Sequence, residues 1–196
     1  MKEMAVILFS AILVNNFVLS KFLGICPFLG VSKRVDSAVG MSVAVIFVML
    51  TATAATYPIY TYILEPKGLG YLQTLVFILV IAAFVQLVEF VLRKYVKPLY
   101  NALGVYLPLI TTNCAILGVT ILNIDSGYTF AQSLVNALGG GLGFMLAMVL
   151  FAGVRRRMES CEVFKPFEGL PITLIAASMV SISFMGFGGV VEGLFK

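Results

Sequence analysis

Two of the three cysteines begin the same short pattern, and this repeat is the clearest chemical signal in the chain. Cys26 opens the segment Cys-Pro-Phe-Leu-Gly-Val, and Cys114, 88 residues later, opens Cys-Ala-Ile-Leu-Gly-Val. Thiolates bind soft metals and iron–sulfur clusters, and two thiols can also join in a disulfide. A cysteine in an apolar helix can equally act as a small hydrophobic residue. The repeated context favours one paired site.

The composition places this pair in a membrane. Hydrophobic residues make up 61% of the chain and charged residues 11%, and the mean hydropathy is +1.07. Ordinary soluble domains have about half apolar and about a quarter charged residues. Because apolar runs of about 20 residues suit helices that cross about 30 Å of hydrocarbon, we predict an all-α integral membrane protein. It forms a single domain, residues 1–196, with six transmembrane helices at 4–31, 38–64, 71–92, 99–123, 130–154 and 170–191.

Positive charge predicts the orientation, because Lys and Arg are retained on the cytoplasmic side. The loops after the first, third and fifth segments carry nine basic residues: Lys33, Arg34, Arg93, Lys94, Lys97, Arg155, Arg156, Arg157 and Lys165. The other face carries three: Lys2, Lys67 and Lys196. We therefore expect both termini outside, and we interpret the arginine run as a topology signal that contacts anionic lipid.

The spacing of the cysteines predicts an inverted repeat. Cys26 lies in the first segment and Cys114 in the fourth, so the repeat unit contains three spans. Because three is an odd number, the second copy has the opposite orientation in the membrane. The two copies cover about 1–93 and 94–196. In such folds functional sites lie near the midplane, where helices are interrupted, so we expect the two cysteines to face each other there.

Local sequence predicts a break beside each cysteine. An unbroken helix over 4–31 would be about 42 Å long, which exceeds the hydrocarbon thickness without a break or strong tilt. The residues that favour a break are Gly24 and Pro27 in the first copy, and Pro108, Thr111, Thr112 and Asn113 in the second. Irregular backbone inside a bilayer needs protein or a cavity to satisfy it.

Counting ligands leaves the site incomplete. Two thiolates are half of the four ligands that a [2Fe-2S] cluster normally takes. Cys161 follows the arginine run in a predicted cytoplasmic loop, so we interpret it as an ordinary free thiol. The missing ligands have to come from another subunit or a second copy of this chain, while simple packing and a disulfide remain open as alternatives.

These residues also carry a family resemblance that covers essentially the whole chain. The segments Leu13 to Leu19, Phe22 to Lys33, Leu107 to Val119 and Phe184 to Gly189 resemble the RnfA (RsxA) family of Rnf electron-transport subunits. The nearest related family is NqrE of the sodium-pumping NADH:quinone oxidoreductase. Pro27 and the Phe-Leu-Gly that follows it favour the Rnf side.

The resemblance implies a subunit without catalytic residues of its own in an ion-translocating oxidoreductase of the prokaryotic cytoplasmic (inner) membrane. Its homologous partner RnfE has the opposite orientation, and each supplies two cysteines to a shared [2Fe-2S] cluster. Carried onto this chain, the ligands are Cys26 and Cys114. Flavins and further iron–sulfur clusters belong to other subunits, namely RnfB, RnfC, RnfD and RnfG. Electrons pass between ferredoxin and NAD+, coupled to movement of Na+ or H+; no nucleic acid is involved.

Several other residues carry weaker expectations. Around the cysteines, Gly24, Pro27, Thr112 and Asn113 are candidates for contact with the cluster, with capping of the broken helix as the alternative role for Asn113 and its threonine neighbours. Lys21 reaches either the site or the membrane interface.

Farther from the cysteines we expect structural roles. Asn15 and Asn16 should bond between helices rather than conduct ions. Glu89, with Gln86 on the same helix face, should pair with Arg93 at i, i+4. The run Gly139 to Gly143 should allow close helix packing. Two other functions stay open: the same role in the quinone-reducing sister complex, or a small secondary transporter in which the cysteines only pack.

Overall fold

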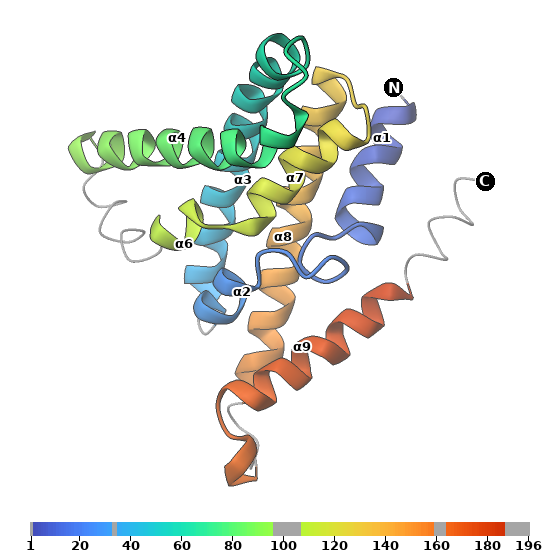
Figure 1. Ribbon diagram of the computed structural model, residues 1–196. Helices are drawn as coiled ribbons and strands as arrows, with labels where there is room; N and C mark the ends of the chain where they lie inside the picture. The colour runs from blue at the N-terminus through green and yellow to red at the C-terminus, as the bar shows by residue number, and fades with distance from the viewer. Residues whose placement is uncertain (1, 33–34, 96–106, 159–163, 187–196) are drawn as a thin grey trace.

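The computed structural model describes residues 2–32, 35–95, 107–158 and 164–186, and the regular structure in these ranges is entirely helical (Figure 1). The elements are α1 (Lys2–Phe9), η1 (Ser10–Val14), α2 (Ile25–Val31), α3 (Val35–Ile59), η2 (Tyr60–Leu64), η3 (Gly70–Leu72), α4 (Gln73–Tyr95), α6 (Leu107–Thr111), α7 (Cys114–Asp125), α8 (Phe130–Met158), η4 (Lys165–Phe167) and α9 (Leu170–Met185). The predicted all-α class is confirmed.

Three stretches are long and apolar enough to cross a membrane: Val35–Leu64, Gly70–Leu87 and Phe130–Met158. Three shorter apolar helices, Met4–Val14, Leu109–Asp125 and Leu170–Met185, lie in the other predicted spans. The first and fourth predicted spans are interrupted, as expected from their sequences.

Two helices extend a few residues beyond the approximate bounds predicted for their spans. The second segment begins at Val35 rather than at residue 38, and the fifth continues through the arginine run to Met158 rather than ending at 154. Arginine has a high helix propensity, and its charge is favourable in the last turn of a helix. The basic residues therefore extend α8 instead of ending it.

The centre of the molecule is an antiparallel pair of helices, α3 and α8 (Figure 1). Apolar side chains from both are completely buried between them and their neighbours, among them Met41, Val45 and Met49 on α3 and Phe144 and Met148 on α8. The helix α1 runs beside α8, and α7 packs against both α3 and α8 (Figure 1). This pair is the rigid frame on which the interrupted segments lie.

The glycine run on α8 lets its neighbours approach closely. A Cβ at Gly139 would lie 2.9 Å from Ala11 Cβ, and one at Gly141 would lie 2.7 Å from Ile46 Cγ1. At Gly143 it would come within 3.2 Å of the carbonyl oxygen of Ala11. Contacts this short leave no room for a side chain, so the prediction of close helix packing is confirmed.

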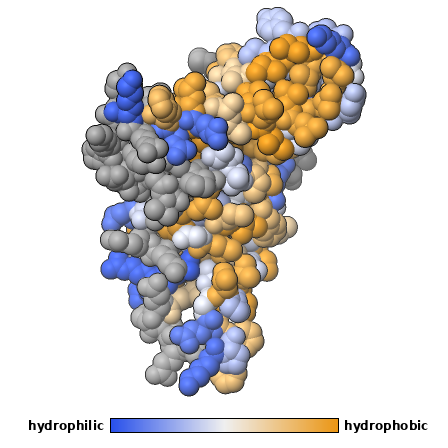
Figure 2. Space-filling view, turned by 60° about the vertical axis from the view of Figure 1, so that its left-hand side comes forward, coloured by the Kyte–Doolittle hydropathy of each residue, from blue (hydrophilic) through white to orange (hydrophobic). Residues whose placement is uncertain are grey.

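The helices α4 and α9 extend away from the central pair and leave large apolar side chains uncovered (Figure 1). On α4 Leu79 is 69% exposed and Phe90 68%, and on α9 Ile182 is 69% exposed. Apolar residues dominate the right-hand side of the view in Figure 2. A soluble monomer rarely shows apolar surface on this scale, whereas lipid or a neighbouring subunit covers such surface in a membrane.

Candidate functional site

The first interruption spans residues 15–24 and is organised by the side chain of Asn16. This residue is completely buried, and its Oδ1 accepts hydrogen bonds from the backbone amides of Val18 (3.0 Å) and Leu19 (3.2 Å). Its Nδ2 donates to the carbonyl oxygens of Ile12 (3.2 Å) and Gly143 (2.8 Å). Asn16 thus supplies the bonds that a broken helix loses and joins the break to α8, which confirms its predicted bonding between helices.

Cys26 lies in the first turn of α2, the short helix that follows the break. Gly24 precedes this helix with φ +81°, a left-handed conformation that favours glycine. Pro27 lies inside the first turn of α2, directly after the break, where its missing N–H has no helical acceptor to lose, which agrees with the prediction that a continuous helix is disfavoured here. Pro27 is buried, whereas the Cys26 side chain is exposed and its thiol is free.

Cys114 is the first residue of α7, the helix that follows the second interruption. Thr111 ends α6, Thr112 lies in the break, and Asn113 caps α7 by accepting a hydrogen bond on Oδ1 from the amide of Ala115 (3.1 Å). The predicted capping role of Asn113 is confirmed. The Cys114 side chain is half-buried, and its thiol is also free.

The two cysteine motifs meet in the folded chain. The backbone N–H of Gly24 donates a hydrogen bond to Cys114 Sγ at 3.0 Å, across 90 residues of sequence. A Cβ at Gly24 would lie 3.1 Å from each of three atoms, belonging to Ala115, Asn113 and Phe144. The backbone just before Cys26 is therefore pressed against the sulfur of Cys114, and no disulfide joins the two thiols.

The surroundings of these thiols suit a negatively charged iron–sulfur group. The Gly24 amide is one donor near them. A second is the side-chain Nδ2 of Asn113, the residue before Cys114, which is buried and has no hydrogen-bond partner within the described ranges. Such amide donors stabilise thiolate sulfur and lower the cost of burying its charge. Among the described residues no group of three or more His, Cys, Asp or Glu side chains comes together. A centre with four ligands accordingly needs two of them from outside this part of the chain.

The weaker candidates lie away from the pair or form local bonds. Asn15 donates from its side chain to Ser10 Oγ at 3.2 Å, within its own segment, so its predicted bonding between helices is wrong. Lys21 is an exposed residue of the break. Glu89 is half-buried and Gln86 exposed on α4. The predicted pairing of Glu89 with the Arg93 side chain, and the expectation for Cys161, fall outside the described residues.

Sequence reasoning missed a residue that holds the Cys26 helix. Arg155 on α8 donates through one guanidinium nitrogen to the carbonyl oxygen of Leu29 (2.7 Å) and to Ser32 Oγ (3.0 Å). One turn earlier on α8, Phe151 stacks on Phe28 of α2 with 4.3 Å between ring centroids. Phe151 and Arg155 are four residues apart and therefore lie on the same face of the helix. This spacing from an apolar residue was the sequence signal that Arg155 faces inward. Arg155 is thus more than the topology signal that we predicted.

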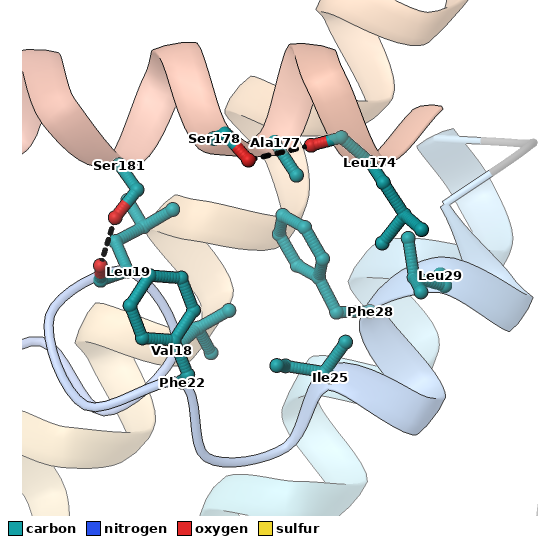
Figure 3. A pocket seen from close by; sticks show the side chains of 10 residues that line it. All are labelled: Val18, Leu19, Phe22, Ile25, Phe28, Leu29, Leu174, Ala177, Ser178 and Ser181. Atoms are coloured by element: carbon teal, nitrogen blue, oxygen red, sulfur yellow. Dashed lines mark hydrogen bonds between the residues drawn. The ribbon is translucent and has the colours of Figure 1, made fainter. Parts of the chain in front are cut away.

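A small cavity lies beside the first interruption, where α9 crosses the break and α2 (Figure 3). Its volume is about 70 Å³. Ile25 and Phe28 of α2 face Leu174 and Ala177 of α9 across it, and the Ser181 hydroxyl donates to the carbonyl oxygen of Leu19 (Figure 3). Small-molecule sites usually measure about 300 to 1,000 Å³. This cavity is therefore a packing gap under α9 rather than a substrate site.

Known proteins match this chain over nearly its full length. The family model described as "Rnf-Nqr subunit, membrane protein" matches residues 4–191. The chain is 59% identical over 187 residues to the component designated A of the Na+-translocating ferredoxin:NAD+ oxidoreductase complex of Acetobacterium woodii, a match that covers 95% of this chain and 97% of that protein. It is 55% identical over 193 residues to the component designated A of the ion-translocating oxidoreductase complex of Syntrophotalea carbinolica, covering 98% and 100%. The component of the same name from Serratia proteamaculans is 53% identical over 192 residues, with the same coverage.

Proposed function

The chain belongs to the Rnf-Nqr family of multi-pass membrane subunits, and from this we propose that it serves in an Rnf-type complex that couples ferredoxin:NAD+ oxidoreduction to translocation of Na+ or H+. Its role there is to carry half of an intramembrane [2Fe-2S] cluster that relays electrons. The support is the contact between the two cysteine motifs, in which the Gly24 amide bonds Cys114 Sγ. The chain works as a non-autonomous subunit of the enzyme.

In this proposal Cys26 and Cys114 bind one side of the cluster. When bound, a [2Fe-2S] cluster supplies a centre that accepts and releases one electron. The N–H of Gly24 orients a positive dipole toward the sulfur of Cys114, and the buried Nδ2 of Asn113, the residue before Cys114, is a further donor without a hydrogen-bond partner in the described part of the chain. The amino-terminal end of α7, where Cys114 lies, adds the positive end of a helix dipole. These groups compensate negative charge that lipid would otherwise disfavour.

The other two ligands come from a homologous subunit, RnfE in Rnf nomenclature. The exposed side chain of Cys26 supports this, because a ligand that this chain used alone would be enclosed by its own residues. Flavins and further iron–sulfur clusters belong to the subunits RnfB, RnfC, RnfD and RnfG. The relatives are named as members of a multi-subunit complex, which agrees with such an assembly.

Six spans arranged as a 3+3 inverted repeat complete the proposed architecture. The α3 and α8 helices, which occupy equivalent places in the two halves, pack together at the centre, while α2 and α7 lead away from the breaks in opposite directions (Figure 1). This arrangement supports a pseudo-two-fold axis in the membrane plane. The membrane is the cytoplasmic membrane, with both termini outside and the basic loops inside.

Cysteine labelling tests the orientation. In a Cys161→Ser background, Lys165→Cys should react with a membrane-impermeant maleimide only in inside-out vesicles, and Lys67→Cys only in right-side-out vesicles. Both lysines are exposed, so a failure to react from either side cannot be attributed to burial in this chain. Labelling of Lys165→Cys from the outer side alone would overturn the orientation.

Electron-transfer assays on membranes test the function. Deleting this chain should abolish NAD+ reduction by reduced ferredoxin and the associated ion uptake by inside-out vesicles, and a plasmid copy should restore both. If the deletion removed quinone reduction by NADH instead, the chain would serve the sister complex. If both electron transfers survived, the solute-transporter alternative would gain support. The relatives favour the first result, since the one from Acetobacterium woodii is named for ferredoxin and NAD+.

A further inference from the structure

Arg155, the first arginine of the basic run on α8, contacts the helix that carries Cys26. The helix α2 has seven residues, Ile25–Val31, with Cys26 in its first turn and Leu29 in its last. A helix this short has few internal hydrogen bonds, and its last carbonyl groups lack helical donors. Something outside α2 therefore has to fix its position.

Two contacts from α8 meet this need. Arg155 donates to Leu29 O at 2.7 Å and to Ser32 Oγ at 3.0 Å, and Ser32 is completely buried. The Phe151 ring stacks on Phe28 at 4.3 Å, so the same face of α8 holds both the side and the end of α2. A cation at the carboxyl end of a helix is also electrostatically favourable.

We infer that Arg155 is a positioning residue that fixes the helix carrying Cys26 by clamping the carboxyl end of α2 to α8. It acts through the helix, because it bonds α2 at the end opposite Cys26. The role rests on the proposed cluster, since it matters for electron relay only where Cys26 is a ligand. Small displacements of a positioned reacting group have large kinetic effects.

Arg156 offers a matched control. It lies next to Arg155 on α8 and carries the same charge, but it is exposed and forms none of these bonds. In the purified complex, Arg155→Gln should shift the midpoint potential of the membrane cluster, broaden its paramagnetic resonance signal and slow electron transfer about tenfold. Arg156→Gln should leave all three unchanged. Arg155→Lys, which keeps the charge but replaces the guanidinium by an ammonium on a shorter side chain, should fall between them.

Hydrogen exchange of α2 provides a readout that does not depend on the cluster. Amides of residues 25–32 should exchange faster in Arg155→Gln than in Arg156→Gln. If Arg155→Gln does not assemble, Ser32→Ala, which removes one acceptor, should show smaller changes in the same direction. Potential, signal and exchange identical to those of the controls would overturn the clamp. A wild-type complex without an intramembrane cluster would instead refute the proposed function, while the exchange data would still decide the contact.

Discussion

Replacing either Cys26 or Cys114 by serine should remove the membrane [2Fe-2S] signal from the purified complex and lower ferredoxin-dependent NAD+ reduction at least about 100-fold, equivalent to about 2.7 kcal/mol of activation free energy. The two motifs meet at one contact, since the Gly24 amide that bonds Cys114 Sγ precedes Cys26 by two residues. The loss of one ligand should therefore have nearly the same effect as the loss of both. The measurements are iron content, paramagnetic resonance of the reduced complex and the rate of NAD+ reduction.

Cys161→Ser is the internal control for the cysteine variants, because the sequence places this third cysteine after the arginine run and away from both repeated motifs. It should retain iron and activity. A complete cluster with wild-type activity in Cys26→Ser would show that the paired motif only packs. A Cys114→Ser complex that keeps its spectrum would show that Cys114 is not a ligand.

Replacing Asn16 by leucine should destabilise the complex by roughly 2 to 4 kcal/mol, because buried backbone groups then lose their partners. The amides of Val18 and Leu19 and the carbonyl of Gly143 all bond this one side chain. Water cannot replace these bonds inside a bilayer. Thermal unfolding of the purified complex and its yield from membranes should both report the loss.

The neighbouring asparagine separates this effect from a general loss of polarity. Asn15 is exposed and its side chain donates only to Ser10 Oγ, so Asn15→Leu should change stability by less than about 0.5 kcal/mol. Asn16→Asp keeps the two acceptor bonds but puts an oxygen against the carbonyl groups of Ile12 and Gly143, so it should destabilise the complex far more than Asn15→Leu. Equal stability of Asn15→Leu and Asn16→Leu would contradict the assigned role of Asn16.

The sequence predicted both breaks and placed the second directly before Cys114, but it did not predict where the first begins. Excess length, Gly24 and the polar run before Cys114 indicate interruption, and interruption is what the structure shows. The first break nevertheless begins at Asn15, well before Gly24, because the Asn16 side chain replaces helical carbonyls for two amides. Asparagine in an apolar segment bonds equally well to a neighbouring helix, so its presence alone does not locate a break.

The sequence points to the two cysteines of the candidate site but not to the arginine that supports the first of them. A repeated motif in a chain with few cysteines is visible by inspection, and Asn113 before Cys114 reads as a helix cap. Arg155 was hidden within a run of three arginines, which charge counting treats as equivalent. Only packing distinguishes them, since Arg155 continues the buried face of Phe151 whereas Arg156 and Arg157 are exposed.

The hydrogen bond from residue 24 to Cys114 Sγ has a consequence for mutational tolerance. Its donor is a main-chain group, so among substitutions only proline, which lacks the N–H, would delete it, and the left-handed backbone with its three close neighbours excludes side chains at this position. Residue 113 is constrained in another way, because its side-chain oxygen caps α7. The polar contact at the Cys114 sulfur is thus set by the main chain, and position 24 is restricted to glycine.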